Sequence, residues 1–140
     1  MHHVAILQPK YVASILGGTK VVESRLSVTR GAPFGKVQPG DVIHFKESGG
    51  AFGATATVAG VMTFEDLRPA DVRTLARRYG RQVAAPAQYW EERAEAKFAT
   101  FIWLTDVRPS HSVPAGFAPT PGARAAWYVL DQAKAARKSA

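Results

Sequence analysis

Lys20, Glu23 and Arg25 bring three charged side chains into six positions directly after a glycine pair. A lysine beside a glutamate can anchor a ligand or relay a proton, and lysine and arginine can neutralise phosphate groups. Because a nearby carboxylate stabilises an ammonium ion, we expect Glu23 to oppose deprotonation of Lys20. The pair is therefore more typical of anchoring or proton relay than of an activated amine. The alternative is that these charges form an ordinary solvated face.

Two predicted elements would position these residues. Apolar side chains at helical spacing predict a helix over residues 9–16, which the glycines at 17 and 18 should end. The β-branched pair Val21 and Val22 then favours a strand. Alternation along that strand places Glu23 and Arg25 on one face, and a bend at the glycines would bring Lys20 to join them.

The full pattern, G-x-K-x-x-E-x-R, is filled by Gly18, Lys20, Glu23 and Arg25, and it resembles the signature of the ASCH domain family. Segments 30–36, 39–41 and 46–50 are similar to one bacterial branch of the same family. The resemblance covers residues 4 to about 130. It implies an α+β fold, a small PUA-like β-barrel with flanking helices, and a cleft in which the signature residues gather.

The resemblance also implies nucleic-acid or nucleoside chemistry, so we expect RNA, DNA, a nucleotide or a nucleoside as the partner. One hypothesis is a binding module that holds its ligand in a basic cleft around the motif. The residues that would contact the ligand are glycines, cations and a serine of the motif and of two later segments. They are Gly18, Lys20, Arg25, Arg30, Lys36, Lys46, Ser48 and Gly50.

The second hypothesis is an enzyme with Lys20 and Glu23 as catalytic residues. Some small ASCH proteins are amidohydrolases of N4-acylated cytidine, and others are proposed ribonucleases. In the amidohydrolase branch the lysine acts with a threonine three residues later and with a glutamate on a downstream helix. Lys20 matches that lysine, but Glu23 stands in the place of the threonine. The downstream glutamate could be Glu91, Glu92 or Glu95.

The loop and the turn that carry the outlying ligand candidates have their own signals. Residues 27–40 lack periodicity and are rich in glycine and proline, which predicts a long loop whose charges, Arg30 and Lys36, are both positive. The segment 46–50 contains paired glycines that could let backbone N–H groups converge on an anion. The alternatives are a flexible basic loop and a plain hairpin turn.

Composition favours one domain over residues 1–130 followed by a basic tail, 131–140. The net charge of +7 favours an anionic partner. The sequence has no cysteine, which excludes disulfides and thiolate zinc sites, and we expect no metal or other cofactor. No apolar stretch approaches the ~20 residues needed to span a membrane, and no signal peptide is apparent. We therefore expect a cytoplasmic protein.

Further strands are predicted over residues 4–7, 42–46, 54–64, 98–107 and 126–130, and helices over 65–79 and 86–97. We expect Gly80 to end the first of these helices, and His2 and His3 to be disordered. His44 is predicted to be a hydrogen-bonded histidine of the barrel. The arginines at 68, 73, 77, 78 and 81 are a secondary candidate for contact with a nucleic-acid backbone.

Overall fold

The computed structural model describes residues 1–130, so the predicted basic tail lies outside the described residues. Six strands and three helices follow one another along this part of the chain. In order they are β1 (His2–Leu7), α1 (Pro9–Leu16), β2 (Val22–Ser27), β3 (Val42–Glu47), β4 (Phe52–Phe64), α2 (Pro69–Val83), α3 (Ala87–Glu92), β5 (Phe98–Pro109) and β6 (Trp127–Leu130).

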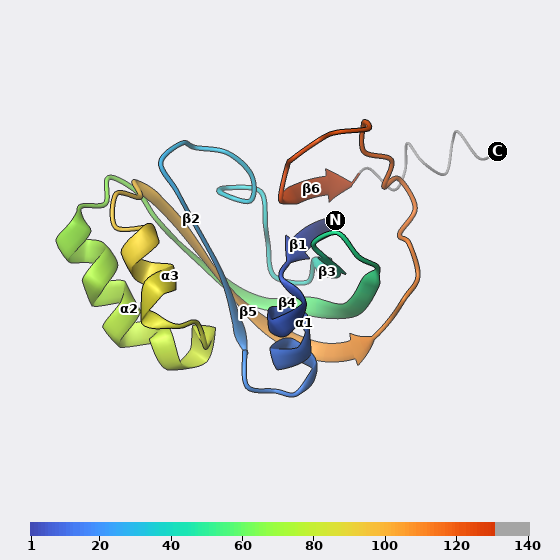
Figure 1. Ribbon diagram of the computed structural model, residues 1–140, viewed down its shortest axis with the longest axis horizontal. Helices are drawn as coiled ribbons and strands as arrows, with labels where there is room; N and C mark the ends of the chain where they lie inside the picture. Colours follow the sequence, from blue (N-terminus) through green and yellow to red (C-terminus); the bar gives the residue numbers. More distant parts are fainter. Residues whose placement is uncertain (131–140) are drawn as a thin grey trace.

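The six strands form one strongly curled sheet in the order β2-β5-β4-β3-β1-β6 (Figure 1). Only β1 and β3 run parallel, and the other neighbouring strands are antiparallel. The sheet does not close, because β2 and β6 are its two edges and do not pair. The α+β fold predicted from the sequence is therefore confirmed, with a half-barrel in place of a closed barrel.

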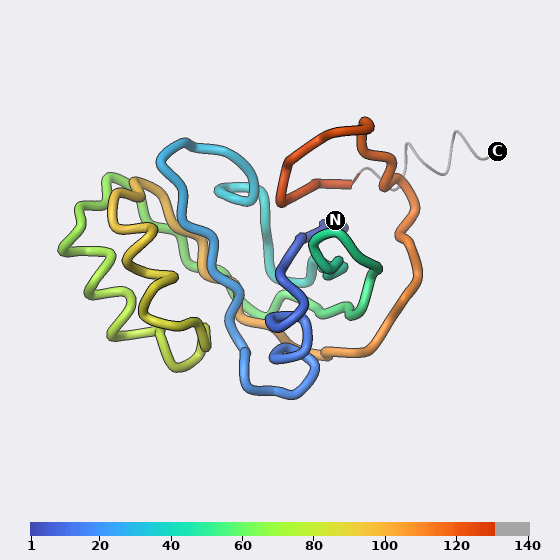
Figure 2. Tube along the Cα trace, viewed as in Figure 1, coloured from blue at the N-terminus to red at the C-terminus, as the bar shows by residue number. Residues whose placement is uncertain are grey.

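The two largest of three apolar clusters lie on opposite faces of the sheet. Helix α1 packs Val12 and Ile15 into the concave core, and α2 and α3 cover the outer face of β2 and β5. Strand β5 serves both cores, since Ile102 faces the concave side and Phe101 faces the two helices. Figure 2 shows the result: α2 and α3 lie on one side of β2, and the first and last strands lie on the other.

The predicted end of α2 at Gly80 is wrong. The helix continues to Val83, whose fully buried side chain extends the apolar stripe of Val72 and Leu75 by another turn. It ends instead at Ala84, which has a left-handed φ of 56°. Helix α3 is also shorter than predicted, because the chain leaves it at Glu92 and continues in turns to residue 95.

The expectation that His2 and His3 are disordered is also wrong, because both lie in β1. His3 is 0% exposed. Its Nδ1 accepts a hydrogen bond from Trp127 Nε1 at 3.2 Å, and its Nε2 donates to Asp41 Oδ2 at 2.8 Å. Within the described residues no group of three or more potential ligands is placed to hold a metal ion. No helix between residues 1 and 130 is long and apolar enough to cross a membrane.

A pair of histidines, His2 and His44, links β1 to β3. His2 Nδ1 lies 2.9 Å from His44 Nε2, which confirms that His44 is hydrogen-bonded, and His44 Nδ1 is buried without a hydrogen-bond partner. Burial lowers the pKa of both imidazoles, and the positive charge of His2 would lower the pKa of His44 further. Burial in the folded state therefore opposes protonation of both rings.

This pair predicts how stability depends on pH. Between pH 7 and pH 5 the unfolded chain binds protons near the ordinary histidine pKa of 6.5, while the folded pair resists them, so the free energy of unfolding falls as pH falls. In His44→Thr this decrease should be smaller. Urea unfolding at the two pH values measures it, with His111→Gln as a control that removes a histidine outside the pair. An unchanged decrease in His44→Thr would contradict the assignment.

Candidate functional site

A cavity of about 460 Å³ lies where the sheet fails to close. Its walls come from the end of β1, from β2, from the start of α3 and from the segment that precedes β6. The signature residues Lys20, Glu23 and Arg25 all line it. The other polar side chains around it are Gln8, Tyr11, Ser24, Ser48, Tyr89, Arg93 and Arg124.

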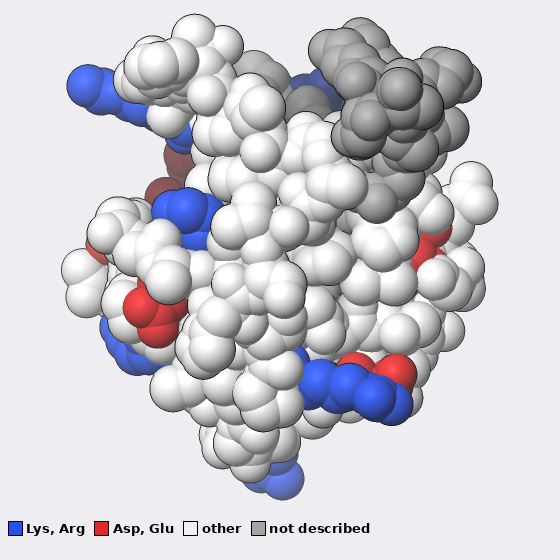
Figure 3. Space-filling model, turned by 90° about the vertical axis from the view of Figure 1, so that its right-hand side faces the viewer, with Lys and Arg blue, Asp and Glu red and all other residues white. Residues whose placement is uncertain are grey.

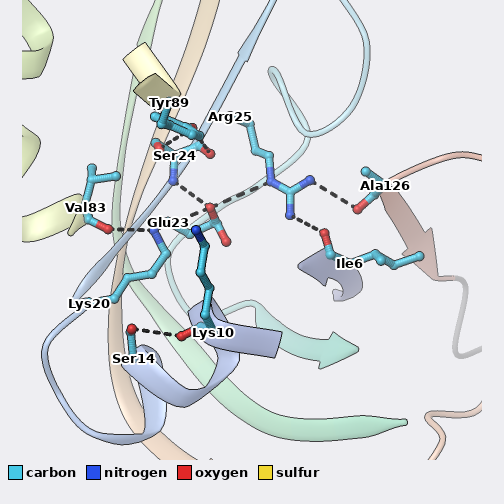
Figure 4. A network of polar contacts seen from close by, with 10 residues as sticks. All are labelled: Ile6, Lys10, Ser14, Lys20, Glu23, Ser24, Arg25, Val83, Tyr89 and Ala126. Carbon is cyan, nitrogen blue, oxygen red and sulfur yellow. Dashed lines mark hydrogen bonds and ion pairs between the residues drawn. The ribbon is translucent and has the colours of Figure 1, made fainter. Parts of the chain in front are cut away.

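Lys20 is buried in the wall of this cavity, with only 4% of its surface exposed. Its Nζ donates to Val83 O at the C-terminal end of α2, at 2.8 Å, where the helix dipole favours a cation (Figure 4). Burial lowers the pKa of Lys20, and Arg25 lowers it further, while Glu23 opposes the shift. The expected opposing effect of Glu23 is thus present, but desolvation of the ammonium outweighs it.

Glu23 lies between the two cations and is 3% exposed. Its Oε1 accepts a hydrogen bond from Ser24 N at 2.9 Å. The same oxygen lies 3.9 Å from Lys20 Nζ and 3.8 Å from Arg25 Nε. Its other oxygen, Oε2, is buried and has no hydrogen-bond partner among the described residues. A buried carboxylate oxygen without a donor is costly, so this atom is available for a donor group of a ligand.

Arg25 spans the gap between the two edges of the sheet. Its Nη1 donates to Ala126 O at 3.3 Å, and its Nη2 donates to Ile6 O at 3.2 Å (Figure 4). The guanidinium also lies over the Trp127 ring, with Cζ 5.2 Å from the ring centroid. One side chain of β2 thus reaches β1 and the segment before β6, which backbone pairing does not connect to β2.

Tyr89 of α3 closes the side of the cavity next to Ser24. The Tyr89 hydroxyl donates to Ser24 O at 3.0 Å and lies 2.6 Å from Ser24 Oγ. Burial, together with the charge of Glu23, raises the pKa of Tyr89 to about 12, so the phenol stays protonated at neutral pH. Arg93 stacks on the Tyr89 ring at 3.8 Å from its centroid and donates to Tyr89 O.

The sequence-predicted residues divide into two groups. The glycine bend does bring Lys20 to Glu23 and Arg25, and Gly18 at this bend has a left-handed φ of 84°. Ser48 lines the same cavity. The remaining ligand candidates and the downstream glutamates do not line it. These are Gly18, Arg30, Lys36, Lys46, Gly50, Glu91, Glu92 and Glu95.

Local contacts explain why the outlying candidates do not reach the cavity. Arg30 pairs with Glu65. Lys46 Nζ donates to Glu47 O in its own turn, at 3.3 Å. Gly50 packs against the same residue, where an added Cβ would lie 3.2 Å from Glu47 Cβ. The turn at 46–50 thus has a compact structure of its own, and only its serine lines the cavity.

Four residues that line the cavity were not predicted from the sequence to belong to the site: Tyr11, Ser24, Arg93 and Arg124. Tyr89 and Arg93 are four residues apart, the spacing at which side chains meet on a helix. That spacing was the available signal. Ser24 and Arg124 carried none, because their positions depend on tertiary contacts.

The Lys20–Glu23–Arg25 cluster predicts strong energetic coupling. Lys20→Met removes one cation from the buried carboxylate and leaves Val83 O without its donor, which should cost about 3 kcal/mol of unfolding free energy. Glu23→Gln neutralises the carboxylate, so the double variant should lose less than the sum of the single losses. Urea denaturation of all four proteins measures the cycle. Additive losses would contradict the coupling.

Comparison with solved structures reveals the same fold elsewhere. An ASCH protein from Zymomonas mobilis superposes with a TM-score of 0.67 at 22% identity, covering 99% of this chain and 92% of that one. A single-residue variant of the same protein gives a TM-score of 0.66 at 21% identity, with 99% and 93% coverage. The hypothetical protein PH0355 gives 0.53 at 20% identity over 79% of this chain and 100% of its own.

Comparison at the level of sequence adds nothing to this, since no family model and no curated protein matches the chain. The structural match to the Zymomonas mobilis protein nevertheless extends over almost the whole chain. The shared architecture is the one that the resemblance of the G-x-K-x-x-E-x-R segment implied. The chain therefore has the fold of an ASCH domain.

Proposed function

We propose that this protein binds a nucleotide unit, either free or as part of RNA or DNA, in the cavity around the G-x-K-x-x-E-x-R motif. The observation that carries the proposal is the free Oε2 of Glu23, a buried carboxylate oxygen held beside two cations in the cavity wall. The cavity volume of about 460 Å³ is within the range of small-molecule sites, roughly 300–1,000 Å³.

The free oxygen of Glu23 sets the chemistry of the ligand group that enters. A carboxylate accepts hydrogen bonds and repels other acceptors, so its partner must carry an N–H or O–H group. The amino groups of nucleobases meet this requirement, and a carboxylate that accepts from the N4 amino group of cytosine is a known pairing. The backbone N–H of Ser24 fixes Oε1, which leaves Oε2 for the ligand.

Cations at the edge of the cavity match the phosphate of a nucleotide. Arg93 and Arg124 both line the cavity, and Lys20 has one donor on Val83 O with further N–H groups available. Among residues 1–130, Arg93 has one ion pair, to the exposed Glu92 at 3.7 Å, which water and salt weaken. An amino group on Glu23 and a phosphate near these arginines would fix both ends of one nucleotide.

Binding should be weak, in the micromolar range or poorer, and should fall as salt is raised, because few cations are involved. Glu23→Gln should weaken binding of cytidine monophosphate about 10- to 100-fold, the scale of a hydrogen bond to a charged group. In this variant the backbone N–H of Ser24 still needs an acceptor, so the new side-chain amide must place its oxygen there. Its NH₂ group then faces the donor group of the ligand, and two donors cannot form a hydrogen bond.

Isothermal titration calorimetry at low ionic strength measures this affinity. Glu95→Gln is the matched control, because it makes the same chemical change on an exposed residue that does not line the cavity. Equal affinities of Glu23→Gln and Glu95→Gln would contradict the role of Glu23. Absence of binding to every nucleotide and oligonucleotide at low salt would refute the proposed function as a whole.

The lowered pKa of Lys20 favours one alternative, a hydrolase that acts on N4-acylcytidine or on RNA with Lys20 and Glu23. A lysine that deprotonates more easily is a better general base or nucleophile. If so, N4-acetylcytidine or RNA should be cleaved, and Lys20→Ala should reduce the rate about 100- to 10,000-fold. Chromatography of the products measures the rate. Cleavage that survives in Lys20→Ala would place the chemistry elsewhere.

A further inference from the structure

We propose that the solvent face of α2 is a second nucleic-acid site, which binds the phosphodiester backbone and is separate from the cavity. We call this surface the α2 arginine row and define it by Arg73, Arg77 and Arg81, with Arg78 beside them. All four side chains are exposed. The inference does not depend on a nucleotide entering the cavity.

Helix geometry aligns these arginines. Val72, Leu75 and Val83 mark the buried side of α2, and the members of the row lie on the opposite side at intervals of four residues. Such intervals correspond to about 6 Å along a helix. Like charges at this spacing repel one another and destabilise a helix. An isolated α2 would therefore gain stability from any polyanion that lies along the row.

No described carboxylate is paired with the row. Within the described residues none of its arginines forms an ion pair with Asp or Glu. Two acids near the N-terminal end of α2 are already engaged, since Asp71 caps the helix through the backbone N–H of Arg68 and Glu65 pairs with Arg30. In the part of the chain that the structure describes, one arginine of the row makes a side-chain hydrogen bond, from Arg77 Nη2 to Thr74 Oγ1 at 3.3 Å.

The opposite end of the molecule differs in charge. Figure 3 shows the face on the β6 side, where lysine and arginine side chains are few, separated by uncharged surface and accompanied by acidic groups. Figure 1 places α2 at the other end of the fold. The row is thus a local concentration of positive charge, which attracts a partner with closely spaced negative charges.

A nucleic-acid backbone fits this surface better than a membrane does. A helix that binds lipid must insert its apolar side, but the apolar side of α2 is packed in the core against Phe101 and Trp90. Guanidinium groups form paired hydrogen bonds with phosphate, and a row of them suits a row of phosphates. The last carbonyl of α2, on Val83, holds Lys20, so the helix ends at the cavity wall.

The salt dependence of oligonucleotide binding tests the proposal. Each phosphate contact contributes about 0.7 to the slope of log affinity against log salt for a single strand, and about 0.9 for a duplex. The variant Arg77→Gln/Arg81→Gln should therefore reduce the slope by about 1.4 to 1.8. Fluorescence polarisation with labelled single-stranded and duplex oligonucleotides measures it, and circular dichroism checks folding, which glutamine should preserve in a helix.

Matched variants separate this site from the cavity. Lys97→Gln/Arg108→Gln removes the same charge from exposed residues outside α2 and should leave the slope unchanged. Arg77→Gln/Arg81→Gln should leave the affinity for cytidine monophosphate unchanged, because neither arginine lines the cavity, so failure of the cavity proposal would not imitate failure of this one. A slope that changes equally in the α2 variant and in the Lys97/Arg108 variant would overturn the proposal. The proposal would also be overturned if Arg77→Gln/Arg81→Gln kept the slope of the unaltered protein and lost binding to phosphatidylserine vesicles.

Discussion

The burial of the Glu23 carboxylate is the constraint on which the rest of this site depends. An ion removed from water must be compensated by nearby charges and hydrogen bonds, and here the compensation comes from Lys20, Arg25 and the backbone of Ser24. Each cation is itself fixed by main-chain carbonyls, Val83 O for Lys20 and Ala126 O with Ile6 O for Arg25. One carboxylate thereby ties α2, β1, β2 and the segment before β6 into a single arrangement.

The open sheet gives this cluster its place. In a closed barrel, backbone hydrogen bonds between β2 and β6 would occupy the seam, and no cavity could form there. Here the Arg25 side chain replaces that pairing, so the two edges are joined while space remains beside them. The same architecture explains why the cavity is lined by residues from both ends of the chain.

The sequence predicted the parts of the site that depend on local geometry. The helix, the glycine bend and the strand alternation that unite Lys20, Glu23 and Arg25 all arise within one short segment, where periodicity and backbone conformation are informative. Partners distant in the chain were not predictable. Val83 is 63 residues from Lys20, and Ala126 is 101 residues from Arg25.

The errors have the same origin. Helix α2 continues past Gly80 because Val83 packs into an apolar cluster. His3 lies in the core because it is hydrogen-bonded to Asp41 and Trp127, although a terminal histidine pair is usually disordered. The predicted raising effect of Glu23 on the pKa of Lys20 was real, but burial of the amine outweighed it. In each case tertiary packing outweighed an effect inferred from neighbours in the sequence.

A crystal structure of the protein with cytidine monophosphate tests the central claim most directly. The account predicts that the base lies in the cavity, with its amino group within hydrogen-bond distance of Glu23 Oε2 and its phosphate near Arg93 or Arg124. A bound nucleotide that contacts only other surfaces, with no donor on Glu23 Oε2, would contradict it.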